Sequence, residues 1–111
     1  MDRKHTLRKM RQDSLDRKVT VLTRYSLSQR LNCSWPGCKE RDLQCLTLDH
    51  ITGNGAAHRR EIGRSSTALY RWIVNNNFPR GFRTLCGSHQ LKAEIQRRIM
   101  ARRNGDDDCP I

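Results

Sequence analysis

The sequence predicts a small α+β domain that is stabilised by zinc and flanked by helices. The chain has 111 residues, of which 35% are hydrophobic and 5% aromatic, so its core is small and a further source of stability is needed. Two pairs of potential zinc ligands, a Cys-x4-Cys and a Cys-x2-His, lie on either side of an alternating apolar segment at 46–50. The four ligands are Cys33, Cys38, Cys86 and His89.

The net charge restricts the kind of partner. It is +11, from 22 Lys and Arg against 11 Asp and Glu. A charge this large favours a polyanion, because binding phosphates releases counterions, and we expect nucleic acid, DNA before RNA. An acidic membrane surface is the rival partner, but no stretch approaches the roughly 18 apolar residues of a membrane span. Residues 1–5 also lack the apolar core of a secretion signal, so no membrane partner is expected.

Cysteine usage predicts a cellular compartment. The chain has five cysteines, an odd number, and nothing points to export, so zinc ligation explains the two pairs better than disulfides do. This predicts an intracellular, cytoplasmic protein. Cys45 lies on a predicted strand between the pairs, and we expect it to be a small buried hydrophobe rather than a ligand.

The N-terminal part is predicted to be a basic arm followed by a helix. Residues 1–12 are rich in Lys and Arg, which is typical of a mobile segment that contacts phosphates, although a merely solubilising tail fits equally well. The domain, residues 13–103, then begins with a helix capped by Asp13 or Ser14, although segment 19–21 also suits a strand. Its apolar residues at helical spacing are Leu15, Val19, Leu22 and Tyr25.

The first pair of ligands is predicted to lie on a strand and tight turn at 31–38. Pro36 and Gly37 force the turn and present both thiolates to one ion. Trp35 stands at its tip, where a packing lid is favoured over a stacking surface. A second strand is expected within 42–51, and the two glycines of 52–57 make that segment a loop.

The C-terminal part is predicted to hold two helices and a strand. Ser65 or Ser66 caps a helix at 67–76, and a strand at 82–86 leads into the last helix. An acidic tail at 104–111 is expected to be disordered. The residues expected to be buried by the first of these helices are Leu69, Trp72 and Ile73, and those forming one apolar stripe on the last are Leu91, Ile95 and Ile99.

Asp49 and His50 are the candidate catalytic residues. A carboxylate beside an imidazole at a strand end, before a glycine-rich loop, suits a hydrolytic site. Asp49 would hold a divalent cation and His50, which titrates near neutral pH, would deprotonate water. From the spacing alone, the alternative of a buried Asp-His hydrogen bond is favoured over a hydrolytic site.

Residues 19–92 resemble the HNH endonucleases, in particular small phage-type members. The resemblance implies a treble-clef, ββα-metal fold that cleaves DNA, with Asp49 binding the catalytic metal and His50 acting as general base. His58 and Arg59 match a recurrent pair there, with phosphate contact or loop bracing as their role. The matching segments are Cys33-x4-Cys38, Leu46–Ile51, Gly53-Asn54-Gly55, His58-Arg59, Tyr70-Arg71-Trp72, Phe78–Phe82 and Leu85-Cys86.

The second ligand pair departs from the family pattern. Many members read Leu-Cys-x-x-Cys-Asn/His-x-x-Lys, whereas this chain is one residue shorter between Cys86 and Lys92. Counted from Cys86, His89 completes the zinc site and Gln90, a weak ligand, takes the catalytic position. Counted from Lys92, His89 becomes the catalytic ligand and Ser88 or nothing completes the zinc site. Zinc prefers nitrogen to a hydroxyl, which favours the first register.

Two functions follow from these expectations. The first is a metal-dependent HNH endonuclease that hydrolyses DNA phosphodiester bonds, with structural zinc and a catalytic Mg²⁺ or Mn²⁺. The alternative is a catalytically degenerate HNH-fold zinc module, which binds DNA or RNA as a component of a nucleoprotein or phage assembly. A protein-interaction zinc domain explains the charge less well. The residues expected to contact nucleic acid are His58, Arg59, Arg60, Arg97 and Arg98.

Overall fold

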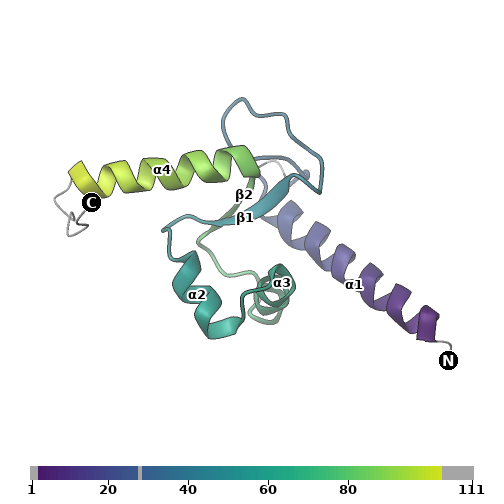
Figure 1. The fold of residues 1–111 in the computed structure, drawn as a ribbon. Helices are drawn as coiled ribbons and strands as arrows, with labels where there is room; N and C mark the ends of the chain where they lie inside the picture. Colours follow the sequence, from purple (N-terminus) through teal and green to yellow (C-terminus); the bar gives the residue numbers. More distant parts are fainter. Residues whose placement is uncertain (1–2, 28, 104–111) are drawn as a thin grey trace.

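The computed structural model describes residues 3–27 and 29–103, and the side chains of Arg3 and His5 are not among its described parts. It confirms the α+β class, with helices around a two-stranded sheet (Figure 1). The tail predicted at 104–111 lies outside the described residues. The elements are α1 (Arg3–Arg24), β1 (Leu46–His50), α2 (Gly55–Ile62), α3 (Ser66–Asn75), β2 (Phe82–Cys86) and α4 (Gly87–Arg103).

The strands β1 and β2 pair antiparallel and divide their side chains between two faces. Successive residues of a strand point to opposite faces, and residues directly opposite each other share a face. Asp49 pairs with Arg83, and His50 pairs with Phe82. The two candidate catalytic residues therefore leave β1 on opposite sides of the sheet, and each meets different neighbours.

The core lies where the sheet meets the C-terminal end of α1 and the helix α3. Val21 and Leu22 of α1 are fully buried, as is Ile73 of α3. The Thr84 hydroxyl on β2, also fully buried, donates a 2.7 Å hydrogen bond to the Leu22 carbonyl, which satisfies a carbonyl at the end of α1. The predicted cap of α3 is confirmed, because the Ser65 hydroxyl accepts the Ala68 amide.

The helix expected to begin at Asp13 or Ser14 begins earlier, within the segment predicted to be a basic arm. Arg3–Arg24 is one helix of 22 residues that passes the expected boundary at 13 without interruption. Its first half is rich in Arg, Lys, Leu, Met and Gln, all strong helix formers, so the segment is helical although little of it is packed. Leu15 and Val19, expected on a packed face, are 49% and 40% exposed.

Three further local predictions need correction. No strand forms within 31–38, because the Cys33 and Cys38 amides donate to carbonyls of their own loop. The strand predicted in 42–51 begins only at Leu46, which leaves Cys45 in an exposed turn instead of buried. The loop predicted at 52–57 ends early, because α2 begins at Gly55.

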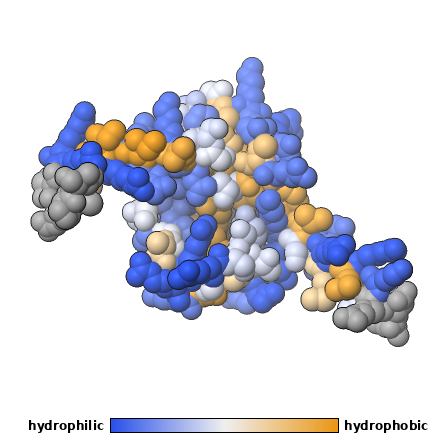
Figure 2. Space-filling model, in the orientation of Figure 1, coloured by the Kyte–Doolittle hydropathy of each residue, from blue (hydrophilic) through white to orange (hydrophobic). Residues whose placement is uncertain are grey.

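The helix α4 exposes the apolar stripe that was expected to identify its packed face. Leu91, Ile95 and Ile99 are 60%, 45% and 42% exposed, and Ala93 is the buried residue of the helix. Figure 2 shows an apolar band along α4 on the viewed face. Both α1 and α4 project from the sheet, and their free ends lie at opposite ends of the molecule (Figure 1). None of the described helices is long and apolar enough to cross a membrane.

Substitutions in α1 should separate its packed end from its projecting end. Leu22→Ala removes a fully buried side chain and should lower the free energy of unfolding by about 2–5 kcal/mol. Leu7→Ala, on the same helix but 46% exposed, should change it by less than about 0.5 kcal/mol. Urea unfolding of both variants with saturating zinc measures the difference. Equal effects would contradict this packing of α1.

Candidate metal centre and catalytic cleft

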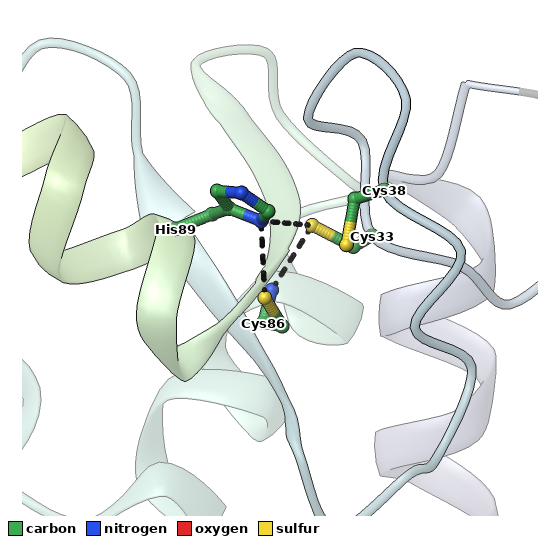
Figure 3. A group of neighbouring side chains, drawn as sticks. All are labelled: Cys33, Cys38, Cys86 and His89. Carbon is green, nitrogen blue, oxygen red and sulfur yellow. Dashed lines mark hydrogen bonds between the residues drawn. The ribbon is translucent and has the colours of Figure 1, made fainter.

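Four side chains from two distant parts of the chain converge on one point. Their ligand atoms all lie within 4.8 Å of one another, and Figure 3 shows them facing a common centre. Two come from the loop after α1, one from the end of β2 and one from the first turn of α4. The cluster is the one predicted from sequence: Cys33, Cys38, Cys86 and His89.

The chain forms the cluster through local turns. The Cys38 amide donates 3.0 Å to the Trp35 carbonyl, and Gly37 adopts a φ of 81°, which glycine accepts without strain. The Cys86 amide donates to the Cys33 sulfur at 3.2 Å, an arrangement that favours a thiolate there. The two pairs of ligands therefore contact each other directly, even without an ion.

The position of His89 resolves the question of register. Its Nδ1 lies 3.2 Å from the Cys86 sulfur and 3.7 Å from the Cys33 sulfur. The indole of Trp35 stacks on the imidazole of His89, with ring centroids 4.9 Å apart and planes 5° from parallel. His89 thus belongs to the cysteine cluster, and Trp35 covers it as the predicted packing lid.

The donor set fits a zinc ion. Three sulfurs and one imidazole nitrogen are the composition of a closed structural zinc site. Burial raises the pKa of the Cys33 thiol to about 11, whereas a backbone hydrogen bond from Glu40 lowers the pKa of Cys38. Zinc requires thiolates, so binding here would release protons and strengthen as the pH rises.

Asp49 points to the face of the sheet opposite His50 and Phe82, and its carboxylate pairs with two arginine side chains. Its side chain is 2% exposed. The Arg83 Nε donates 3.0 Å to one carboxylate oxygen, and Arg97 of α4 lies 3.3 Å from the other. The expected alternative of a buried Asp-His hydrogen bond is wrong, because Asp49 pairs with these guanidinium groups instead.

Asp49 and His50 nevertheless open into one cleft of about 270 Å³ between β1, α2 and α4. From α4 come Gln90, Glu94 and Arg97, which share a helix face because they are four and three residues apart. The N-terminus of α2 borders the same cleft, and the Asn54 side chain does not cap it. The full lining is Asp49, His50, Gly53, Gly55, Ala56, Arg59, Gln90, Glu94 and Arg97.

His50 is held by a second histidine. Its Nε2 lies 3.0 Å from the Nδ1 of His58, on α2, and its ring meets Phe82 edge-on at 4.8 Å. Burial lowers the pKa of His50, and the nearby His58 and Arg59 lower it further. His50 is therefore held in the neutral form that a general base needs.

The predicted nucleic-acid contacts divide into two groups. Arg59 and Arg97 line the cleft, and His58 braces His50 from behind. Arg60 and Arg98 do not line it, and Arg98 instead pairs with Glu94 at 2.9 Å. All five positions are on α2 or α4, so the basic side chains surround the cleft from two helices.

Sequence reasoning missed Arg83 and Glu94. Arg83 becomes a partner of Asp49 through the register of β1 with β2, which no local pattern reveals. Glu94 follows Gln90 by four residues on a predicted helix, a signal that could have placed it at the cleft. Comparison of this chain with protein-family models, curated proteins and solved structures finds no match.

Removing the metal should unfold the domain. Structural zinc supplies about 10–16 kcal/mol of binding free energy in small zinc domains. The free energy of unfolding of a whole domain is of similar size, about 5–15 kcal/mol. A chelator should therefore abolish cooperative unfolding, as followed by circular dichroism, and zinc should restore it. Cys86→Ser should lose stoichiometric zinc, whereas Cys45→Ser, outside the cluster, should retain it. A chelated protein with an unchanged melting transition would exclude a structural metal.

Proposed function

We propose that the protein is a metal-dependent endonuclease of the HNH type, which hydrolyses phosphodiester bonds of DNA. One observation carries the proposal: the buried Asp49 and the neutral His50 open into a single cleft bordered by Arg59 and Arg97. A carboxylate, a base and two guanidinium groups are what hydrolysis of a phosphodiester requires in one place.

The order of the elements supports this assignment. An antiparallel hairpin, β1 and β2, is followed at once by α4, and the Cys₃His cluster joins the hairpin to that helix. This is the arrangement expected of a treble-clef, ββα-metal domain, with its structural zinc at one end of the hairpin and the catalytic residues at the other. Asp49 and His50 end β1, whereas Cys86 ends β2 opposite Leu46.

The cleft has the features of a phosphate site. Guanidinium groups of Arg59 and Arg97 border it, and both can donate hydrogen bonds to phosphate oxygens. The first turn of α2 adds backbone N–H groups without an intrahelical partner and the positive end of a helix dipole. The net charge of +11 would bring DNA to this surface.

In this proposal His50 takes the proton from the attacking water, and the guanidinium groups stabilise the charge that develops on the phosphate. Asp49, with Gln90 and Glu94 from α4, is an all-oxygen donor set, the type that suits Mg²⁺ or Mn²⁺. Such a cation, when bound, offsets the charge of the leaving oxygen. Gln90 alone is a weak second ligand. Glu94, which lines the same cleft and pairs with Arg98, would have to supply the carboxylate that the predicted set lacked.

The alternative is a zinc module that binds DNA or RNA without cutting it, as part of a nucleoprotein assembly. The specific observation in its favour is the pairing of Asp49 with both Arg83 and Arg97. A cation at Asp49 must share the carboxylate with these guanidinium groups. In a binding module, the same ion pairs would simply fix Arg83 and Arg97 for phosphate contact.

Plasmid nicking distinguishes the two functions. With Mg²⁺ or Mn²⁺ the protein should convert supercoiled plasmid to the open circle, and His50→Ala should lower the rate by about 10²–10⁴-fold, the usual contribution of a general base. Ile51→Ala, at the next and 48% exposed position, is the matched control and should nick normally. Zinc content should be unchanged in both, and both should remain folded, although His50→Ala, which truncates a buried side chain, should melt at a lower temperature.

Substitution of Glu94, the carboxylate that α4 contributes to the cleft, gives a second test of the nuclease function. Glu94→Ala should raise the concentration of Mn²⁺ needed for half-maximal nicking, whereas Arg98→Ala, which removes only its exposed partner, should not. Binding without nicking across these metals, with affinity that falls steeply as salt rises, would replace the nuclease by the binding module.

A further inference from the structure

We propose that His58 is a positioning residue, which holds the proton of His50 on Nε2 and thereby presents its Nδ1 to the cleft as the basic nitrogen. The inference rests on the proposed nuclease function and specifies how its base is prepared. It assigns to His58 a role that neither its charge nor its place on α2 indicated.

The two nitrogens of His50 have different surroundings. Nε2 lies 3.0 Å from the Nδ1 of His58. Nδ1, separated from Nε2 by Cε1, points another way, and a Cβ added to Gly55 would lie 3.0 Å from it. Gly55 lines the cleft that contains Asp49, so the Nδ1 edge is the one turned toward that cleft.

Two neutral imidazoles can share a hydrogen bond in two ways, with either ring as the donor. The electrostatics of the cleft favour His50 as the donor. The positive end of α2 begins at Gly55, next to Nδ1, and Arg59 and Arg97 face His50 from the same cleft. The two carboxylates of the cleft are already paired, Asp49 with Arg83 and Arg97 and Glu94 with Arg98. The remaining positive charge favours a lone pair over an N–H at Nδ1, so the proton of His50 belongs on Nε2, where it is donated to His58.

The position of His58 leaves one of its polar atoms without a hydrogen bond. Its own Nε2 is buried and has no hydrogen-bond partner among the described residues. An unpaired buried nitrogen in a native fold calls for an explanation beyond stability. The ring is fixed by an edge-to-face contact with Trp72, with centroids 4.2 Å apart, so it can hold His50 in one orientation. The bond from His50 to the other ring nitrogen, Nδ1, is the role we assign to this half-buried side chain.

Substitution of His58 should separate this role from packing. His58→Phe keeps a ring against Trp72 but offers no acceptor, and should lower kcat for plasmid nicking by about 10- to 100-fold, the usual effect of losing such a supporting hydrogen bond. KM should change little, because His58 does not line the Asp49 cleft. His58→Gln supplies an amide oxygen as acceptor and should recover most of the rate. Equal rates for the Phe and Gln variants would overturn the proposal.

Gly55→Ala tests the other edge of His50. The added methyl would crowd Nδ1 and should reduce nicking strongly, while DNA binding and zinc content persist. Gly87→Ala is the matched control, since Gly87 is also the first residue of a helix and a Cβ there meets nothing within 4 Å. Full activity of a folded Gly55→Ala protein would show that Nδ1 is not the basic nitrogen and would overturn the proposal.

A measurement without any turnover separates this inference from the nuclease function. In ¹⁵N-labelled protein, long-range ¹H–¹⁵N couplings at neutral pH should identify His50 as protonated on Nε2 with a free Nδ1. The proton should redistribute in His58→Phe. A wild-type His50 protonated on Nδ1 would overturn the proposal even if plasmid is cut, and the expected tautomer would support it even if nicking fails.

Discussion

The convergence of three cysteines and one histidine is the constraint on which the rest of the structure depends. The ligand atoms come from positions as distant in sequence as Cys33 and His89, yet all lie within 4.8 Å of one another. The apolar core around Leu22, Leu48 and Ile73 is small for a chain that also carries two projecting basic helices. One ion bound at this cluster would join the loop after α1 to the end of β2 and the start of α4, and so add to the stability that the small core provides.

The same constraint positions the candidate catalytic residues. His89 must face the cluster, so the residues four and eight positions later, Ala93 and Arg97, lie on the same side of α4, toward the hairpin. Ala93 is 2% exposed, and its small side chain permits close approach of the helix. Arg97 thereby reaches Asp49, with Gln90 at the same cleft. The hairpin contributes Asp49 and His50, and the position of His89 in the cluster determines which side chains of α4 they meet.

The sequence predicted the parts that depend on short spacing. The ligand pairs, the strand at 82–86 and the Ser65 cap each depend on residues within one turn or strand, and all three are observed. The packed face of α4 could not be predicted in this way. Leu91 follows His89 by two residues, about 200° around a helix, so with His89 facing the cysteine cluster the apolar stripe faces solvent. Strand register brings Arg83 to Asp49, and the position of α2 brings His58 to His50, and neither contact has a local signal.

The coordination of the metal tests the central claim most directly. X-ray absorption at the zinc edge of the purified protein should give three sulfur neighbours at about 2.3 Å and one nitrogen at about 2.0–2.1 Å, the distances of a closed Cys₃His site. His89→Ala should remove the nitrogen while leaving the three sulfurs. A site with four sulfurs, with oxygen neighbours in the wild type, or with nitrogen retained in the His89 variant would contradict the role given to His89, and with it the placement of α4 over Asp49.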